Sequence, residues 1–172
     1  YKHVGTEYLQ SPGRSRLWLN QAVFAKHLPI FPVPKARREQ EPELRPSEHT
    51  DFRSSSGGST WLTRTRPDTV ANAHTLQKCL AAPTVFDMVK ANELVRHFHE
   101  TAEYGLHYVS LGPGGTRLLI FFDAAKSDTD GKNKPVLGFW ILWALDNKET
   151  MDGRALILFY EGKDSTRVGK SS

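Results

Sequence analysis

Residues 117–122 form an apolar run, Arg-Leu-Leu-Ile-Phe-Phe, which ends at Asp123. Two further apolar runs follow at residues 136–145 and 155–160, and a polar stretch with the turn pair Asp130-Gly131 precedes the first of them. Short runs of branched and aromatic residues joined by turn residues are typical of sequential strands. The C-terminal part of the chain is therefore predicted to be a three-stranded antiparallel meander.

The residues before this sheet change to a helical period. The clearest predicted helix begins at Thr84, which forms a capping-box-like pair with Asp87, and Gly105 is expected to end it. Its apolar residues recur at helical spacing: Val85, Met88, Val89, Val95, Phe98 and Ala102. His97 and His99 are two residues apart, so on this helix they point to different faces and are not expected to share a metal ion.

A linker and two shorter helices are predicted before this helix. Residues 35–46 are rich in charge and proline and are expected to form an exposed linker. Ser47 is a good N-cap for a helix that runs to about Leu62. Its small residues, 54–59, lower helix propensity but permit a close approach by a neighbour, and a flexible Ser/Gly loop is the alternative. The second helix has Pro67 in its first turn, where a missing N–H has no cost.

The N-terminal part is predicted to begin with a β-hairpin. Its strands are expected at residues 4–10 and 16–19, because Ser11-Pro12-Gly13 is a turn signal. Asn20 can then cap a short helix over residues 21–28. The chain as a whole is expected to combine a helical middle with antiparallel strands at both ends.

Composition restricts the class of protein. The 172 residues suit one domain or two small ones, and one cysteine excludes a disulfide within the chain, which fits a reducing compartment. No apolar stretch approaches the ~18 residues of a membrane span, so no membrane partner is expected. The chain begins at Tyr1 without a signal pattern and is expected to be internal to something longer. The net charge of +4 weakly favours a polyanionic partner.

Two groups of residues are candidates for chemistry. Asp123 follows buried-type apolar residues at a strand end, where a carboxylate can hold a hard cation such as Mg²⁺, although a solvated strand-end Asp is the simpler interpretation. Two-metal nucleases use several such carboxylates to activate water, and one Asp is not a cluster. Lys163, Arg167 and Lys170 form a basic segment that can contact phosphates, and an ordinary exposed charged loop is the alternative.

The order of motifs resembles the polymerase segment of copia-type retrotransposon polyproteins. The matching features are, in order, Gln21, the linker up to Pro46, Phe52-Arg53-Ser54, Trp61-Leu62, Thr65-Arg66-Pro67-Asp68, the helical stretch 90–96, Phe121-Phe122-Asp123-Ala124, Gly138-Phe139-Trp140 and the basic segment 163–172 that ends in Ser-Ser. The resemblance covers nearly the whole chain. It departs at residues 134–137, Lys-Pro-Val-Leu, where the family usually has polar residues and a Gln.

The resemblance implies an α+β fold in which a helical connection is followed by a truncated RNase H-like antiparallel sheet. Residues 1–46 would be the tail of a reverse transcriptase, 47–111 the helical connection and 112–172 the first part of the RNase H domain. The family's polymerase aspartate pair and its later RNase H carboxylates do not fall within the chain. The chain is therefore expected to be an inactive fragment in isolation. Its expected location is intracellular, in the cytoplasm or the nucleus.

Site residues and partners also follow from the resemblance. Asp123 would be the first catalytic, Mg²⁺-binding carboxylate, while Lys163, Arg167 and Lys170 would lie near the backbone of an RNA–DNA hybrid. Arg53 and Arg66 are further nucleic-acid candidates, although each can instead pair with a nearby aspartate. The partners would be the hybrid and the rest of the polyprotein. The alternative is a remnant without catalysis that binds nucleic acid or another protein.

Overall fold

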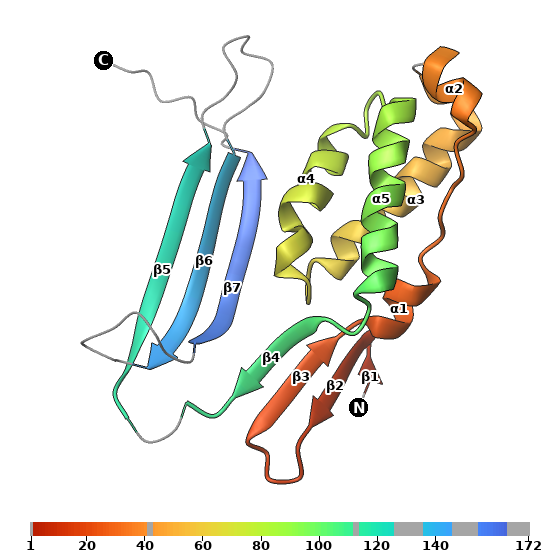
Figure 1. Cartoon of the computed structure of the whole chain (residues 1–172). Coiled ribbons are helices and arrows are strands. Elements are labelled where there is room, and N and C mark those ends of the chain that lie inside the picture. Colours follow the sequence, from red (N-terminus) through yellow and green to blue (C-terminus); the bar gives the residue numbers. More distant parts are fainter. Residues whose placement is uncertain (1, 41–42, 112–113, 126–135, 146–154, 165–172) are drawn as a thin grey trace, which may run out of the picture. The chain divides into compact units, whose positions relative to one another are not determined.

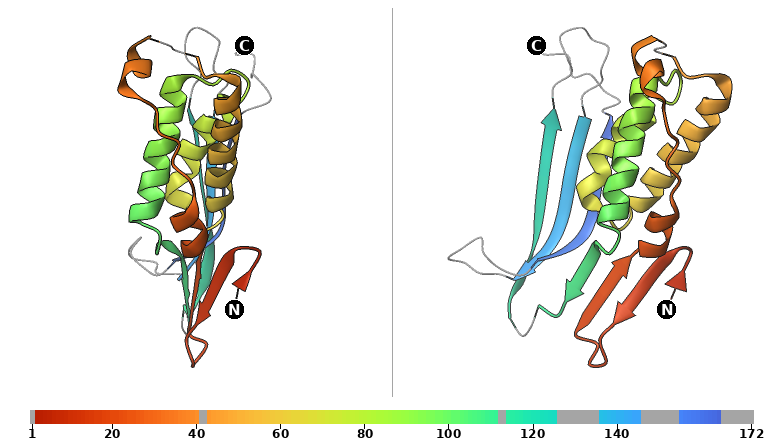
Figure 2. Two further views of the ribbon diagram at one scale, coloured as in Figure 1. Left: turned by 90° about the vertical axis from the view of Figure 1, so that its right-hand side faces the viewer. Right: turned by 45° about the vertical axis from the view of Figure 1, so that its right-hand side comes forward.

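The computed structural model describes residues 2–40, 43–111, 114–125, 136–145 and 155–164, and it has an α+β fold. The chain divides into two compact units, of which the first comprises residues 1–9 and 18–106 and the second residues 10–17 and 107–172. Figures 1 and 2 show the helices of the first unit and the strands of the second. The predicted ranges 1–46, 47–111 and 112–172 concern evolutionary origin and stay a prediction.

The predicted N-terminal hairpin is present. Strands β2 (Thr6–Gln10) and β3 (Arg16–Asn20) are neighbours in a sheet of order β1-β2-β3-β4, with β1 at Lys2–His3 and β4 at Gly105–Val109. The prediction that Gly105 ends a helix is wrong, because Gly105 is the first residue of β4. A Cβ at Gly105 would lie 2.2 Å from the carbonyl oxygen of Leu19, so the glycine allows a close approach of two backbones.

The short N-terminal helix is α1 (Ala22–His27), and the predicted cap is wrong, because Gln21 and not Asn20 is the N-cap. Asn20 precedes it, and its Oδ1 accepts the N–H of Ala22 at 3.2 Å. The exposed linker is only partly present. Residues Lys35–Gln40 form helix α2, and Leu44 is buried in the core. Arg37 forms an ion pair with Glu48, which fixes this helix to the next one. The prediction of a fully exposed linker is therefore wrong for this segment, although its residues are rich in charge.

Helix α3 (Pro46–Leu62) confirms the predicted helix, so the alternative of a Ser/Gly loop is wrong. The predicted N-cap is also wrong. Arg45 is the N-cap, because Pro46 suits the first helical position and the carboxylate of Glu48 accepts the N–H of Arg45 at 2.8 Å. The small residues do permit a close approach, since a Cβ on Gly58 would lie 2.4 Å from a methyl carbon of Leu28.

A 3-10 turn, η1 (Pro67–Thr69), leads into α4 (Val70–Lys78), and a short connection leads to α5 (Val85–Glu100). The capping box at α5 is confirmed: Thr84 accepts the N–H of Asp87, and Asp87 accepts the N–H of Thr84. The buried apolar side chains of these helices form one core with α1 and α3. It includes Ala25, Leu28, Leu44, Phe52, Leu62, Ala73, Leu76, Val85, Met88, Ala91, Leu94, Val95, Phe98 and Ala102.

The second unit contains the predicted meander. Strands β5 (Thr116–Ala125), β6 (Val136–Leu145) and β7 (Ala155–Asp164) form an antiparallel sheet in that order. The outer strands extend beyond their predicted ends, so Asp123 lies inside β5 and not after it. Strand β7 pairs with β6, and the register of this pairing shifts between Ile141 and Leu142. None of the helices in the described ranges is long and apolar enough to cross a membrane.

Candidate functional site

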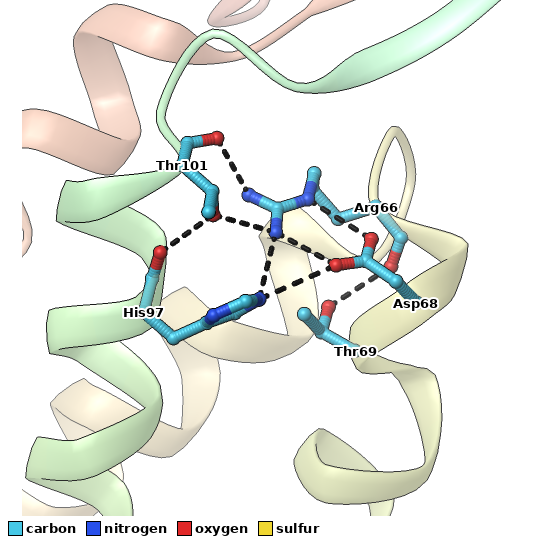
Figure 3. Close-up of polar contacts among 5 residues, drawn as sticks. All are labelled: Arg66, Asp68, Thr69, His97 and Thr101. Atoms are coloured by element: carbon cyan, nitrogen blue, oxygen red, sulfur yellow. Dashed lines mark hydrogen bonds and ion pairs between the residues drawn. The ribbon is translucent and has the colours of Figure 1, made fainter.

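A cluster of polar contacts in the first unit surrounds Arg66, whose side chain is 3% exposed (Figure 3). Arg66 is the N-cap of η1, and its guanidinium binds the carboxylate of Asp68 through two hydrogen bonds. Nε donates to Oδ1 at 3.0 Å and Nη2 donates to Oδ2 at 2.7 Å. Two parallel hydrogen bonds of this kind are the strong arrangement for a guanidinium and a carboxylate.

The same guanidinium also reaches the C-terminal end of α5. Nη1 donates to the carbonyl oxygen of Thr101 at 3.1 Å, and Nη2 donates to its hydroxyl at 2.8 Å. Nη2 also lies 3.1 Å from Nε2 of His97, and this ring nitrogen is 3.4 Å from Oδ2 of Asp68. Arg66 therefore joins the start of η1 to the end of α5, where a cation also stabilises the unpaired carbonyls of a helix terminus.

The electrostatics of the cluster favour an ionised Asp68. Burial opposes ionisation, but the hydrogen bonds and charge of Arg66, with a smaller contribution from His97, outweigh it and hold the pKa of Asp68 below its ordinary value. The rings of Phe98 and Tyr104 each have a centroid 5.4 Å from the guanidinium carbon of Arg66. A cation between two aromatic rings and a carboxylate is well satisfied within the protein, so this cluster is built for stability.

A groove of about 720 Å³ lies between α4 and α5 beside this cluster. Asp68 and His97 lie at one end and Lys90 at the other, while Glu93 lies one helical turn from each of the two α5 residues. The side chains of Leu76 and Leu94 form the apolar part of the groove's lining. Its volume is in the range of small-molecule sites. Its charged side chains are of both signs, so the groove is not a uniformly basic surface of the kind that binds a polyanion.

Asp123 is exposed in the second unit, on the first strand of the sheet. It pairs with Gly138 on β6, while Glu161 of β7 pairs with Phe139. Because side chains alternate between the faces of a sheet, Glu161 and Asp123 lie on opposite faces. Within the described ranges, no group of three His, Cys, Asp or Glu side chains is placed to hold a metal ion. The described residues therefore do not fit a Mg²⁺ site.

The basic candidates lie in different places. Arg53 is exposed on α3, whereas Arg66 is buried and its donors are used internally. Lys163 belongs to β7, where it pairs with Leu137, and Arg167 and Lys170 lie outside the described residues. Arg53 and Arg66 therefore do not form one exposed basic surface. The remaining candidate contacts with nucleic acid stay predictions.

No known protein family, curated protein or solved structure matches the chain.

Two polar residues of this unit make contacts that the sequence did not predict. Thr101 has no motif that marks it as a partner of Arg66, 35 positions earlier. Asn92 is buried, and its amide makes two hydrogen bonds with the backbone of Phe31, at 3.0 and 2.7 Å. The only available signal for Asn92 was its place on the apolar face of a helix, where a polar side chain needs a partner.

Proposed function

We propose that the chain is a fragment of a copia-type retrotransposon reverse transcriptase and RNase H, whose ancestral activity is DNA synthesis on RNA and cleavage of RNA in RNA–DNA hybrids. The observation that supports it is Asp123 on the first strand of an antiparallel meander that follows a helical segment. The order of the sequence motifs is the second support.

In this proposal Asp123 is the first carboxylate of the nuclease site and the basic residues hold the hybrid. A bound Mg²⁺ would supply charge stabilisation and an activated water in the complete domain. A single carboxylate binds Mg²⁺ poorly, because the ion keeps most of its water and needs several charged ligands. The chain alone is therefore expected to show neither DNA synthesis nor hybrid cleavage.

The test is a hybrid-binding titration at several salt concentrations with the whole chain. If Lys163, Arg167 and Lys170 neutralise three phosphates, the slope of log affinity against log salt is roughly −2 to −3. Changing all three to Ala should flatten this slope, whereas Arg96→Ala, an exposed change on α5, should leave it nearly unaltered. Hybrid cleavage by the chain alone, or a triple variant that binds as the original does, would refute this assignment.

The alternative is a remnant that binds nucleic acid or protein without ancestral catalysis. Its specific support is the apolar surface of the β5–β7 sheet, where Phe122 is 83% exposed. Joining the chain to the segment that follows Ser-Ser in the family distinguishes the two. Cleavage that appears on joining and disappears with Asp123→Asn favours the nuclease fragment, and hybrid binding without cleavage favours the remnant.

A further inference from the structure

Strand β5 is an edge of its sheet, since it pairs only with β6 among the described strands (Figures 1 and 2). All ten of its residues pair with β6 in one unbroken register. Leu118, Ile120 and Phe122 are 56%, 59% and 83% exposed. A long, regular, apolar edge strand presents a row of backbone N–H and C=O groups that another strand can join.

The opposite edge of the sheet, strand β7, is less open. Its register with β6 shifts at Ile141/Leu142, and irregularities of this kind twist an edge away from a partner. The hydroxyl of Tyr108 donates a hydrogen bond to the carbonyl oxygen of Ile157 at 3.0 Å. Strand β5 has no proline and no register shift, so it is the edge that is suited to pairing.

The sequence of β5 is complementary to itself. Its two charged residues, Arg117 and Asp123, are each three positions from Ile120 and have opposite signs. If two copies of β5 pair antiparallel about a two-fold axis at Ile120, Arg117 of each copy lies opposite Asp123 of the other. The same register puts Leu118 opposite Phe122.

Side chains that are directly opposite in an antiparallel pair lie on one face, with Cβ atoms about 4.5–5.5 Å apart. A guanidinium and a carboxylate can bridge that separation, so each dimer gains two cross-strand ion pairs. Other registers lose them. In-register parallel pairing puts Arg117 against Arg117, and a two-residue slip places each charge opposite an uncharged residue. The charges therefore select one partner and one alignment.

We propose that this chain self-associates through β5, forming a two-fold dimer in which the two three-stranded sheets become continuous. The occupant of the edge is a second copy, because the charge pattern of β5 matches its own reverse. Arg117 and Asp123 also interact within their own chain. A guanidinium has five N–H donors and a carboxylate accepts several hydrogen bonds, so the cross-strand pair adds to those interactions.

A charge exchange tests the proposal with the whole chain, by sedimentation equilibrium at low salt. Arg117→Asp creates two Asp–Asp pairs per dimer and Asp123→Arg two Arg–Arg pairs, so each variant should dimerise at least about tenfold more weakly. An equimolar mixture of the two variants should form a heterodimer, in which both ion pairs are restored. The double variant should regain the homodimer. Arg96→Glu on α5 is the matched control and should dimerise normally.

A cysteine pair tests the register. In a Cys79→Ser background, Ile120→Cys should form an interchain disulfide under mild oxidation, because directly opposed residues lie within disulfide range. Leu118→Cys should not, since the two copies of residue 118 would be about 13 Å apart along the strands. Circular dichroism of each variant checks that the fold is retained.

Several outcomes would overturn the proposal. One is that the chain stays monomeric at all concentrations up to about 100 times a typical micromolar dissociation constant. The others are a dimer that neither charge variant weakens, and cysteines at positions 118 and 120 that crosslink equally well. Each of these outcomes leaves the proposed nuclease origin untouched, because hybrid binding is measured separately.

Discussion

Replacing Arg66 by Met should destabilise the helical unit substantially. The change removes two hydrogen bonds to Asp68, two to Thr101 and the polar contact with His97. Removing one member of a fully buried ion pair costs about 3–5 kcal/mol. Asp68 is 46% exposed and water can replace part of its loss, while Met retains apolar contact with the rings of Phe98 and Tyr104. The expected loss is therefore about 2–4 kcal/mol.

Urea unfolding followed by circular dichroism at the helical band measures this loss, because the helices belong to the unit that contains Arg66. The stability of Arg66→Lys should lie between that of Arg66→Met and that of the original chain, since an ammonium cannot make the two parallel hydrogen bonds to Asp68. Arg96→Met, on the exposed face of α5, is the control and should change stability by less than about 0.5 kcal/mol. A loss below about 1 kcal/mol for Arg66→Met, together with weaker hybrid binding, would refute the structural role and favour a nucleic-acid contact.

Three further predictions concern single positions. Because the pKa of Asp68 is held below its ordinary value, its contribution to stability is present above about pH 4 and is lost as the pH falls further. The free energy of unfolding should therefore decrease less steeply with falling pH in Asp68→Asn than in the original chain. Gly105→Ala should destabilise by about 1–3 kcal/mol in urea unfolding, because its Cβ would lie 2.2 Å from the Leu19 oxygen, and a neutral result would contradict the close approach. Asp123→Asn should change thermal stability little, within about 0.5 kcal/mol, and a larger loss would indicate a structural carboxylate.

Local signals in the sequence predicted the fold well where one segment contains all the necessary information. The capping pair of Thr84 and Asp87 lies within four residues, and it correctly located the start of α5. The alternation of apolar runs and turns likewise predicted the β5–β7 meander. The errors occurred where a partner lies elsewhere in the chain. Residues 35–46 were predicted to be a solvated linker because nothing local shows that Arg37 pairs with Glu48.

The same reasoning explains what was missed at the candidate site. Arg66 and Asp68 are two residues apart, and their pairing was recognised as an alternative from the sequence. His97 and Thr101 are 31 and 35 positions from Arg66, and only packing of α5 against η1 and α4 brings them together. Gly105 was misassigned for a related reason. A glycine near a helix end suggests a C-cap, whereas its requirement comes from the backbone of Leu19, far away in sequence.

Asp123 links the two proposals, and they make opposite demands on it. As a nuclease ligand it must keep its negative charge available to a cation on the sheet surface. As a member of the β5 pair it faces Arg117 of a second copy, whose positive charge lowers the affinity of the carboxylate for any cation. Self-association would therefore suppress metal binding at this position. Metal affinity has to be compared at protein concentrations below and above dimerisation, because a weak value measured on the dimer would reflect the neighbouring guanidinium as well as the missing ligands.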